Sequence, residues 1–140
     1  MDAIWNTVEE LTPHACLSLL ARHSFGRVGL SVDALPVVLP VNYAFDAERI
    51  VLRSGAGSKL TAAMREAVVC FEIDGVDPVG GAGWSVLVTG VAKELQGHDA
   101  VRAAALPLRS WSPSATDHLI AIGIDVVSGR RVGPALAVTG

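Results

Sequence analysis

Charged side chains are scarce in this sequence, and basic clusters are absent. Only 18% of the 140 residues are charged, and the formal net charge is −3 at pH 7. Nucleic-acid-binding domains usually carry a basic face, and no cluster of Lys and Arg occurs here. The apolar stretches are interrupted well before the length of a membrane span, and residues 1–10 hold three acids and no base, unlike a targeting segment. We therefore expect a cytoplasmic protein that binds neither nucleic acid nor membrane.

The residues of common catalytic and metal sites are also scarce. The two cysteines, Cys16 and Cys70, lie far apart without a CxxC partner, and we expect both to be reduced, buried thiols. The four histidines show neither HxxxH nor HExxH spacing, so no metal site is expected. The sequence has no GxSxG motif and no evident Cys/His pair. This absence favours chemistry carried by a bound cofactor over chemistry carried by side chains.

The pattern of apolar and turn residues predicts one mainly β domain over residues 1–131, followed by a tail over 132–140. A helix is predicted to begin at the N-cap Thr12, with Pro13 in its first turn, and to end near Arg22. Short helices are expected over 60–65 and 99–106, with loops over 75–83 and 108–117. Strands are expected over 26–31, 35–45, 50–53, 67–73, 84–94 and 118–127.

About six strands in hairpins, with no βαβ alternation, indicate a closed or half-closed antiparallel barrel. Pro40 cannot donate a hydrogen bond to a strand ladder, so its strand is predicted to have an edge or a bulge there. The low charged fraction is typical of a small domain that hides part of its surface in an oligomer.

The segment Ser54–Lys59 is the most informative one. It is a loop with two glycines that follows a predicted strand and leads into a predicted helix, with Ser58 as candidate N-cap. Free N–H groups and the helix dipole favour an anion at such a place. Ser54 and Ser58 supply hydroxyls there. Arg53 and Lys59 supply positive charge, so the segment is a candidate site for a phosphate monoester. It matches neither GxxxxGK[ST] nor GxGxxG, and the alternative is an ordinary polar turn before a capped helix.

Three other side chains have two interpretations each, and a fourth, Glu72, raises a question of its own. Trp84 and Trp111 fit either an apolar core or contact with a flat aromatic ligand. Arg130, at the end of the last predicted strand, is either solvated or a partner for an anionic ligand. Glu72 lies within an apolar strand and would need a partner if it were buried, but the sequence does not supply that partner.

Taken in order, these segments resemble the pyridoxamine 5′-phosphate oxidase-like proteins, also called flavin-binding split barrels, and most closely their short bacterial branch. The resemblance covers residues 10–131. The segments that carry it are CLSLL (16–20) before FGRV (25–28), PVVLPVNY (36–43), IVLRSG (50–55) with GSKL (57–60), VVCFEID (68–74), GWSV (83–86) with TG (89–90), and SGRR (128–131).

The resemblance implies a six-stranded antiparallel split barrel that forms a homodimer, with two FMN sites between the subunits. It places one set of residues along the isoalloxazine edge: Pro40, Val41 and Asn42. It places Arg53 and Ser54 near the ribityl phosphate, and Ser58 and Lys59 on the phosphate itself. It brings a further set to the cofactor near the interface, some from the second subunit: Trp84, Ser85, Trp111 and Arg130.

Three functions remain open on this fold. The first is an FMN-dependent oxidoreductase that transfers hydride between flavin and a small-molecule substrate. The second is a reductase that uses a deazaflavin coenzyme. The third is a non-enzymatic module that binds a flavin or another nucleotide. Because one fold hosts all three, the fold itself does not choose among them.

Overall fold

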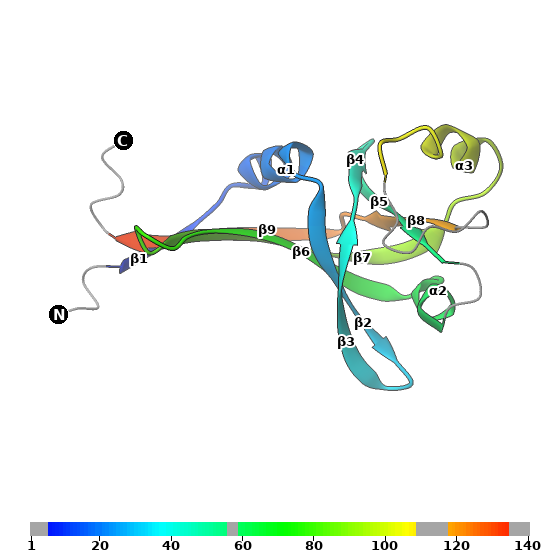
Figure 1. The fold of residues 1–140 in the computed structure, drawn as a ribbon, viewed down its shortest axis with the longest axis horizontal. Coiled ribbons are helices and arrows are strands. Elements are labelled where there is room, and N and C mark those ends of the chain that lie inside the picture. Colours follow the sequence, from blue (N-terminus) through cyan, green and yellow to red (C-terminus); the bar gives the residue numbers. More distant parts are fainter. Residues whose placement is uncertain (1–5, 56–58, 109–117, 135–140) are drawn as a thin grey trace.

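The computed structural model describes residues 6–55, 59–108 and 118–134 (Figure 1). These residues form nine strands and three helices. In chain order they are β1 (Asn6–Glu10), α1 (Pro13–Arg22), β2 (Phe25–Val32), β3 (Leu35–Asn42), β4 (Ala44–Asp46), β5 (Arg49–Ser54), α2 (Lys59–Met64), β6 (Val68–Asp77), β7 (Ala82–Glu94), α3 (Gly97–Ala103), β8 (His118–Gly123) and β9 (Val126–Pro134). None of the helices in these ranges is both long and apolar enough to cross a membrane.

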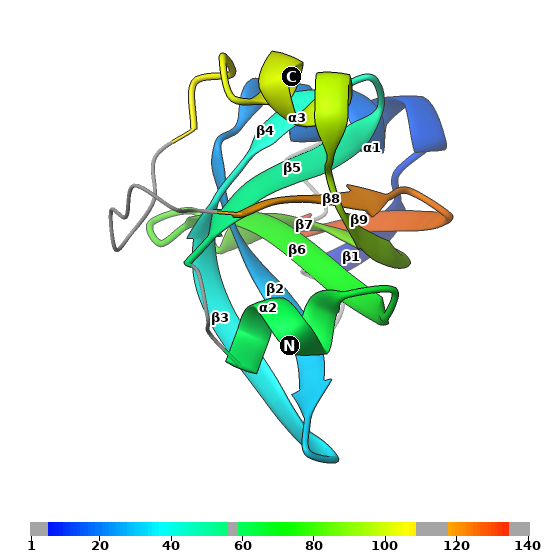
Figure 2. The same cartoon turned by 90° about the vertical axis from the view of Figure 1, so that its right-hand side faces the viewer.

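The strands form an antiparallel split barrel, which confirms the predicted fold class. Neighbouring strands follow the order β3-β2-β6-β7-β8-β5-β4. Only Tyr43 separates β3 from β4, so these two count as one strand that bends from β2 towards β5. With that count, the wall has the six predicted strands, and Figure 2 shows it from one end. The predicted strand 35–45 is therefore one chain segment. Its first part, β3, forms one edge of the sheet, and its last part, β4, forms the other edge.

Tyr43 fixes the bend between β3 and β4. Its side chain is buried, and its hydroxyl donates a hydrogen bond of 2.6 Å to the Leu20 carbonyl oxygen of α1. Its backbone N–H donates to the Ser24 carbonyl oxygen at 2.9 Å. The Tyr43 ring also packs edge-on against Phe71 in the core, with ring centroids 4.8 Å apart. The bend is thus tied both to the first helix and to β6.

Helix α1 begins and ends as predicted. The Thr12 hydroxyl accepts a hydrogen bond from the Ala15 N–H, and Pro13 occupies the first turn. Its apolar face buries Cys16 and Leu20 over the inner side of the sheet. Gly129 of β9 allows this close approach, because a Cβ there would lie 2.7 Å from the Cys16 sulfur. Cys70 lies half-buried on the other side of the sheet.

The predicted strand 118–127 is wrong as a single strand, since it is divided into β8 and β9. Strand β7 pairs with β9 over Gly83–Thr89 and with β8 over Ala92–Glu94. At the change of partner, the Asp125 N–H donates to the Thr89 carbonyl oxygen and the Asp125 carboxylate accepts from the Val91 N–H. Strand β9 then continues to Pro134 and pairs with β1, forming an extended arm (Figure 1). The remainder of the expected tail, 135–140, lies outside the described residues.

The predicted loop 75–83 is also wrong, because β6 and β7 extend into it and leave only residues 78–81 as a turn. Its glycines suggested a loop, but Gly75 is a strand residue whose missing side chain makes room for Trp84. A Cβ on Gly75 would lie 2.7 Å from the indole Cε2 of Trp84. Gly81 has a φ of 71° in the turn, which is the conformation that glycine adopts most readily.

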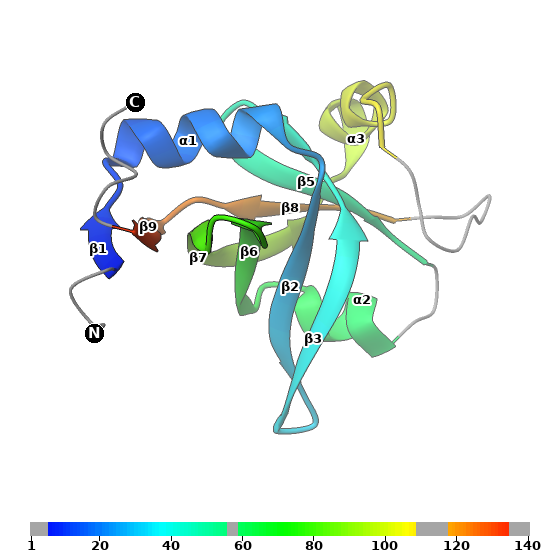
Figure 3. The same cartoon turned by 60° about the vertical axis from the view of Figure 1, so that its left-hand side comes forward.

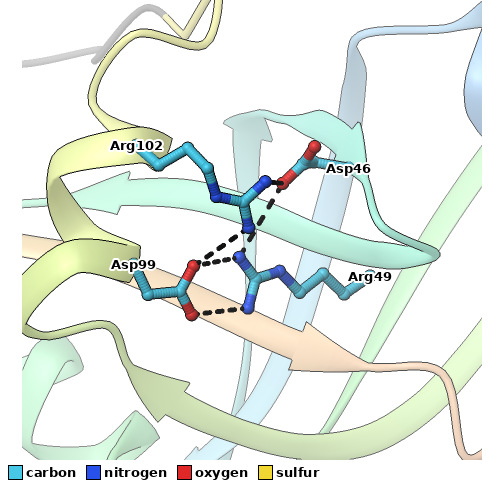
Figure 4. Close-up of polar contacts among 4 residues, drawn as sticks. All are labelled: Asp46, Arg49, Asp99 and Arg102. Atoms are coloured by element: carbon cyan, nitrogen blue, oxygen red, sulfur yellow. Dashed lines mark hydrogen bonds and ion pairs between the residues drawn. The ribbon is translucent and has the colours of Figure 1, made fainter.

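Four charged side chains hold α3 against the hairpin of β4 and β5 (Figure 4). Arg49 donates two hydrogen bonds to the Asp99 carboxylate, at 3.0 and 2.7 Å, in a bidentate pair. Arg102 also bonds to Asp99, at 3.3 Å, and Asp46 lies within 4 Å of both guanidinium groups. Beneath this cluster, Val51 and Ala121 pack against Ala103 of α3. The helix thus covers the outer side of β5 and β8.

The pairing with Arg49, supported by Arg102, lowers the pKa of Asp99 from 3.8 to about 2. A carboxyl with a depressed pKa stabilises the fold above its unfolded pKa, and this stabilisation is lost as the pH falls through the folded value. We therefore expect the variant Asp99→Asn to lose less stability than the wild type between about pH 4 and pH 2. Urea unfolding over this range measures the difference. The exposed substitution Glu66→Gln is the control, and parallel pH curves for wild type and Asp99→Asn would contradict the assignment.

Candidate functional site at the split of the barrel

The barrel wall is open between β3 and the end of β5. Strand β4 pairs only with Arg49, Ile50 and Val51 of β5. In the part of the chain that the structure describes, no strand pairs with the next residues of β5 on that side, nor with the outer edge of β3. The polar backbone groups of two strand edges therefore border one opening. Figure 3 shows the edge strand β3, and α2 packs against its neighbour β2.

The edge of β3 carries the first group of residues implied by the resemblance. Pro40 and Asn42 lie on the outer face of the sheet, opposite Arg27 and Phe25 of β2. Val41, between them, points inwards and packs against the barrel core. The prediction that Pro40 lies on an edge strand is confirmed, because β3 ends the sheet and a missing N–H costs no ladder bond at an edge.

The end of β5 carries the second group. Arg53 Nη2 donates to the Ala104 carbonyl oxygen just after α3, at 3.1 Å. Ser54 points to the other side, where its hydroxyl lies 2.6 Å from that of Thr61 in α2. Thr61 is buried and donates its own proton to the Gly55 carbonyl oxygen at 2.9 Å, so Ser54 is the donor to Thr61. These bonds tie the start of the candidate phosphate loop to α2.

Thr61 is a residue that the sequence prediction missed. Its position within a short helix gave no signal, because only the fold brings it against Ser54 and Gly55. Helix α2 starts at Lys59, as the loop pattern predicted. Ser58 and Trp111 lie outside the described residues, as does the side chain of Lys59.

A half-buried pair of hydrogen-bonded side chains lies beside this loop. His118 of β8 is the strand partner of Ser54, and its Nδ1 bonds to the Glu94 carboxylate. Glu94 also accepts from Arg65, just after α2, at 3.0 Å. These contacts, the one with His118 first, lower the pKa of Glu94. The residues after the loop are therefore held by Ser54–Thr61 at one end and by Arg65–Glu94 at the other.

The described members of the third group lie on β7 and β9 and do not share a face. Ser85 of β7 faces outwards opposite Arg130 of β9. Trp84 faces inwards, with its ring 5.0 Å from that of His23 and its indole over Gly75. Two strands, β2 and β6, separate Ser85 from β3, which is about 14 Å at the usual strand spacing. Within one chain, Ser85 and Arg130 are thus remote from the split.

The outer face of the sheet between these groups carries a charged cluster that was not predicted. Arg27 Nη1 lies 3.3 Å from Glu72 and 3.0 Å from Asp74, which supplies the partner that Glu72 lacked in the sequence. Desolvation, and then the neighbouring Asp74, raise the pKa of Glu72 to about 7, although Arg27 opposes the shift. The signal in the sequence was the charged residue in an apolar strand, but its partner lies 45 residues away.

A groove of about 490 Å³ extends from this cluster to the arm. Its lining combines Glu72 with Ser85 and Leu87 of β7, Ser128 and Arg130 of β9, and Val8 and Glu10 of β1. Among the described residues, no group of three His, Cys, Asp or Glu side chains is placed to hold a metal ion.

Comparison with known proteins decides the family. The family model for pyridoxamine 5′-phosphate oxidase matches residues 12–131. The chain belongs to the pyridoxamine 5′-phosphate oxidase family. It is 35% identical over 130 residues to the uncharacterized protein Rv0080 of Mycobacterium tuberculosis, covering 89% of this chain and 86% of that protein.

Solved structures of other members have the same fold. The FAD-binding protein from Mycobacterium smegmatis superposes with a TM-score of 0.80 at 29% identity, covering 89% of this chain and 98% of that one. An FAD-binding protein from Mesorhizobium loti gives a TM-score of 0.74 at 27% identity, covering 91% and 98%. The family resemblance and the split-barrel fold predicted from the sequence are thus both confirmed.

Proposed function

We propose that this member of the pyridoxamine 5′-phosphate oxidase family binds a flavin nucleotide at the split of its barrel, with a phosphate at the segment Ser54–Lys59. The observation that carries the proposal is the opening between two unpaired strand edges, with the loop into α2 at its end. Unpaired backbone N–H and C=O groups suit a flat ring whose rim alternates carbonyl oxygens and N–H groups, as the flavin ring does.

The residues at the split fit such a group. Thr61 and Ser54 hold the start of the loop, so its backbone is set before a ligand arrives. Gly55 has open space where a side chain would project. Pro40 and Asn42 leave their side chains on the outer face, beside the opening. The FAD-binding relatives at 29% and 27% identity support a flavin, and they favour FAD as an alternative to the FMN expected from the sequence.

We further propose that the working form is a homodimer. Large apolar side chains on the outer face of the sheet are each 42% to 73% exposed: Val8, Phe25, Val38, Val68, Val76, Leu87 and Val126. An apolar face of this kind marks an interaction surface in a soluble protein. A second copy on this face would bring Ser85 and Arg130 to the partner's split, which they do not reach within one chain.

As an activity we propose oxidoreduction of a small-molecule substrate. A bound flavin supplies hydride and electron transfer, and the chain supplies binding, orientation and exclusion of water. The parts of the chain that would bind and orient the flavin are the two strand edges and the loop at Ser54. The outer-face groups that a second copy would cover would help to exclude water. A deazaflavin reductase and a non-enzymatic flavin-binding module remain the alternatives. Titration with a deazaflavin coenzyme tests the first, and an assay for oxidation of reduced flavin by candidate acceptors tests the second.

The test of the phosphate assignment is the variant Lys59→Ala. We expect it to weaken FMN binding by about tenfold or more, because one charge-assisted contact to the phosphate is lost. Riboflavin, which lacks the phosphate, should bind wild type and variant equally. Quenching of flavin fluorescence measures both affinities, and FAD is titrated in the same way.

The matched control is Lys93→Ala, since Lys93 is an exposed lysine of β7 away from the split. Unchanged FMN affinity in Lys59→Ala would remove Lys59 from the site. A wild-type protein that binds neither FMN nor FAD would refute flavin binding, and titration with a deazaflavin coenzyme would then test the reductase alternative.

A further inference from the structure

The charged cluster of Arg27, Glu72 and Asp74 lies in the middle of the apolar outer face. Strand register places Pro40, Arg27, Glu72, Leu87 and Ser128 in one row across β3, β2, β6, β7 and β9. The side chains of the cluster are only half-exposed already in the single chain, at 44% for Arg27, 31% for Glu72 and 35% for Asp74. Any partner that covers this face must therefore cover these three groups.

The charged groups on this face come from four strands. Strand β2 supplies Arg27 and β6 supplies Glu72 and Asp74, while β9 supplies Arg130 and β1 supplies Glu10. On β3 and β7 the described residues beside the cluster are uncharged. With all groups ionised, two positive charges meet three negative ones. One proton on the cluster makes the described face neutral.

Both signs of charge on one face suit a second copy of the same chain. In an interface with two-fold symmetry the same patch serves both subunits, so a patch must complement itself. The arginines and carboxylates of this face can do so, and the apolar side chains around them provide the burial. A partner of one charge sign would leave part of the cluster unpaired.

We propose that two copies of this chain associate through the outer face of the sheet and that their association takes up protons at Glu72. The inference rests on the homodimer proposed above and adds that its dissociation constant depends on pH. The proposed homodimer would bring Ser85 and Arg130 to the partner's split, and in that arrangement the same protons would favour completion of the ligand site.

The sign follows from desolvation. In the single chain, partial burial and Asp74 already raise the pKa of Glu72 to about 7. Covering the face removes further water and disfavours the ionised carboxylate, so the pKa rises again on association. A group that binds its proton more tightly in the dimer favours the dimer at low pH. Association should therefore weaken as the pH rises through neutrality.

The experiment is sedimentation velocity on the full chain without added flavin, from about pH 6 to about pH 8.5. We expect the dimer dissociation constant of the wild type to rise by about tenfold or more over this range. The variant Glu72→Gln, which keeps the shape and stays neutral, should associate at high pH as the wild type does at low pH. If the wild-type dimer is too tight to dissociate, both proteins are measured in the weakened background Val68→Ser.

The control is Glu48→Gln, an exposed carboxylate in the turn between β4 and β5, which should keep the wild-type pH profile. A dissociation constant that does not depend on pH, or that falls as the pH rises, overturns the proton uptake and leaves the dimer standing. A monomer at every pH overturns the dimer as well. The flavin titrations of Lys59→Ala are a separate measurement, so failure of flavin binding is recognised independently.

Discussion

The variant Gly90→Ala should lose about 3 kcal/mol of folding stability, and we expect it to accumulate poorly as a folded protein. Gly90 lies on β7 where its partner changes from β9 to β8. A Cβ there would lie 2.7 Å from the carbonyl carbon of Gly123, and closer still to its oxygen. These are backbone atoms, so the clash is relieved only by moving β8 away from β7.

The consequence reaches the split, because β8 also carries His118 opposite Ser54. Thermal and urea unfolding measure the loss of stability. The matched control is Gly55→Ala, which has open space around the new methyl group and should stay within about 0.5 kcal/mol of wild type. A Gly90→Ala protein as stable as the control would mean that β7 and β8 are not this close.

The variant Phe71→Ala should lose about 3–5 kcal/mol, the range for removing a buried aromatic ring from a core. Phe71 of β6 is fully buried and packs edge-on against Tyr43 at the bend between β3 and β4. It also fills the space over Gly26, where a Cβ would lie 2.5 Å from the ring. Removing the ring leaves a cavity directly behind the strand that borders the split.

The comparison is with Phe71→Leu, which keeps most of the apolar volume and should cost clearly less. Urea unfolding of the two variants gives the difference in free energy. A Phe71→Ala protein that unfolds at the same urea concentration as Phe71→Leu would show that the ring does not support the bend.

The features that the sequence alone could determine are local ones. Helix α1 could be predicted because Thr12 and Pro13 act within one turn of their own helix. The hairpin of β4 and β5 followed from a short polar turn between β-branched strands, and it closes with Ala47 and Glu48 at positive φ. The order of such segments also indicated the family and the six-stranded barrel wall. The comparisons confirm the family, and the observed strand order confirms the wall.

Part of the candidate site could also be predicted from its segments. The loop at Ser54 stands between a strand and a helix, as its glycines indicated, and Pro40 lies on an edge strand, as a missing N–H requires. Residue roles at the split remain proposals. The sequence did not reveal which side chains point to the same face of the sheet, because that depends on the register in which each strand pairs with its neighbours.

The remaining features were decided by tertiary structure alone. The division of β8 from β9 depends on Gly90 meeting Gly123, and the anchor of the loop depends on Thr61 meeting Ser54. The partner of Glu72 is Arg27 on a strand 45 residues earlier. Each of these contacts is set by the register between strands, which the hydrophobic pattern of a single segment does not encode. The sequence by itself determined the elements and their family, and only the register determined which of their side chains meet.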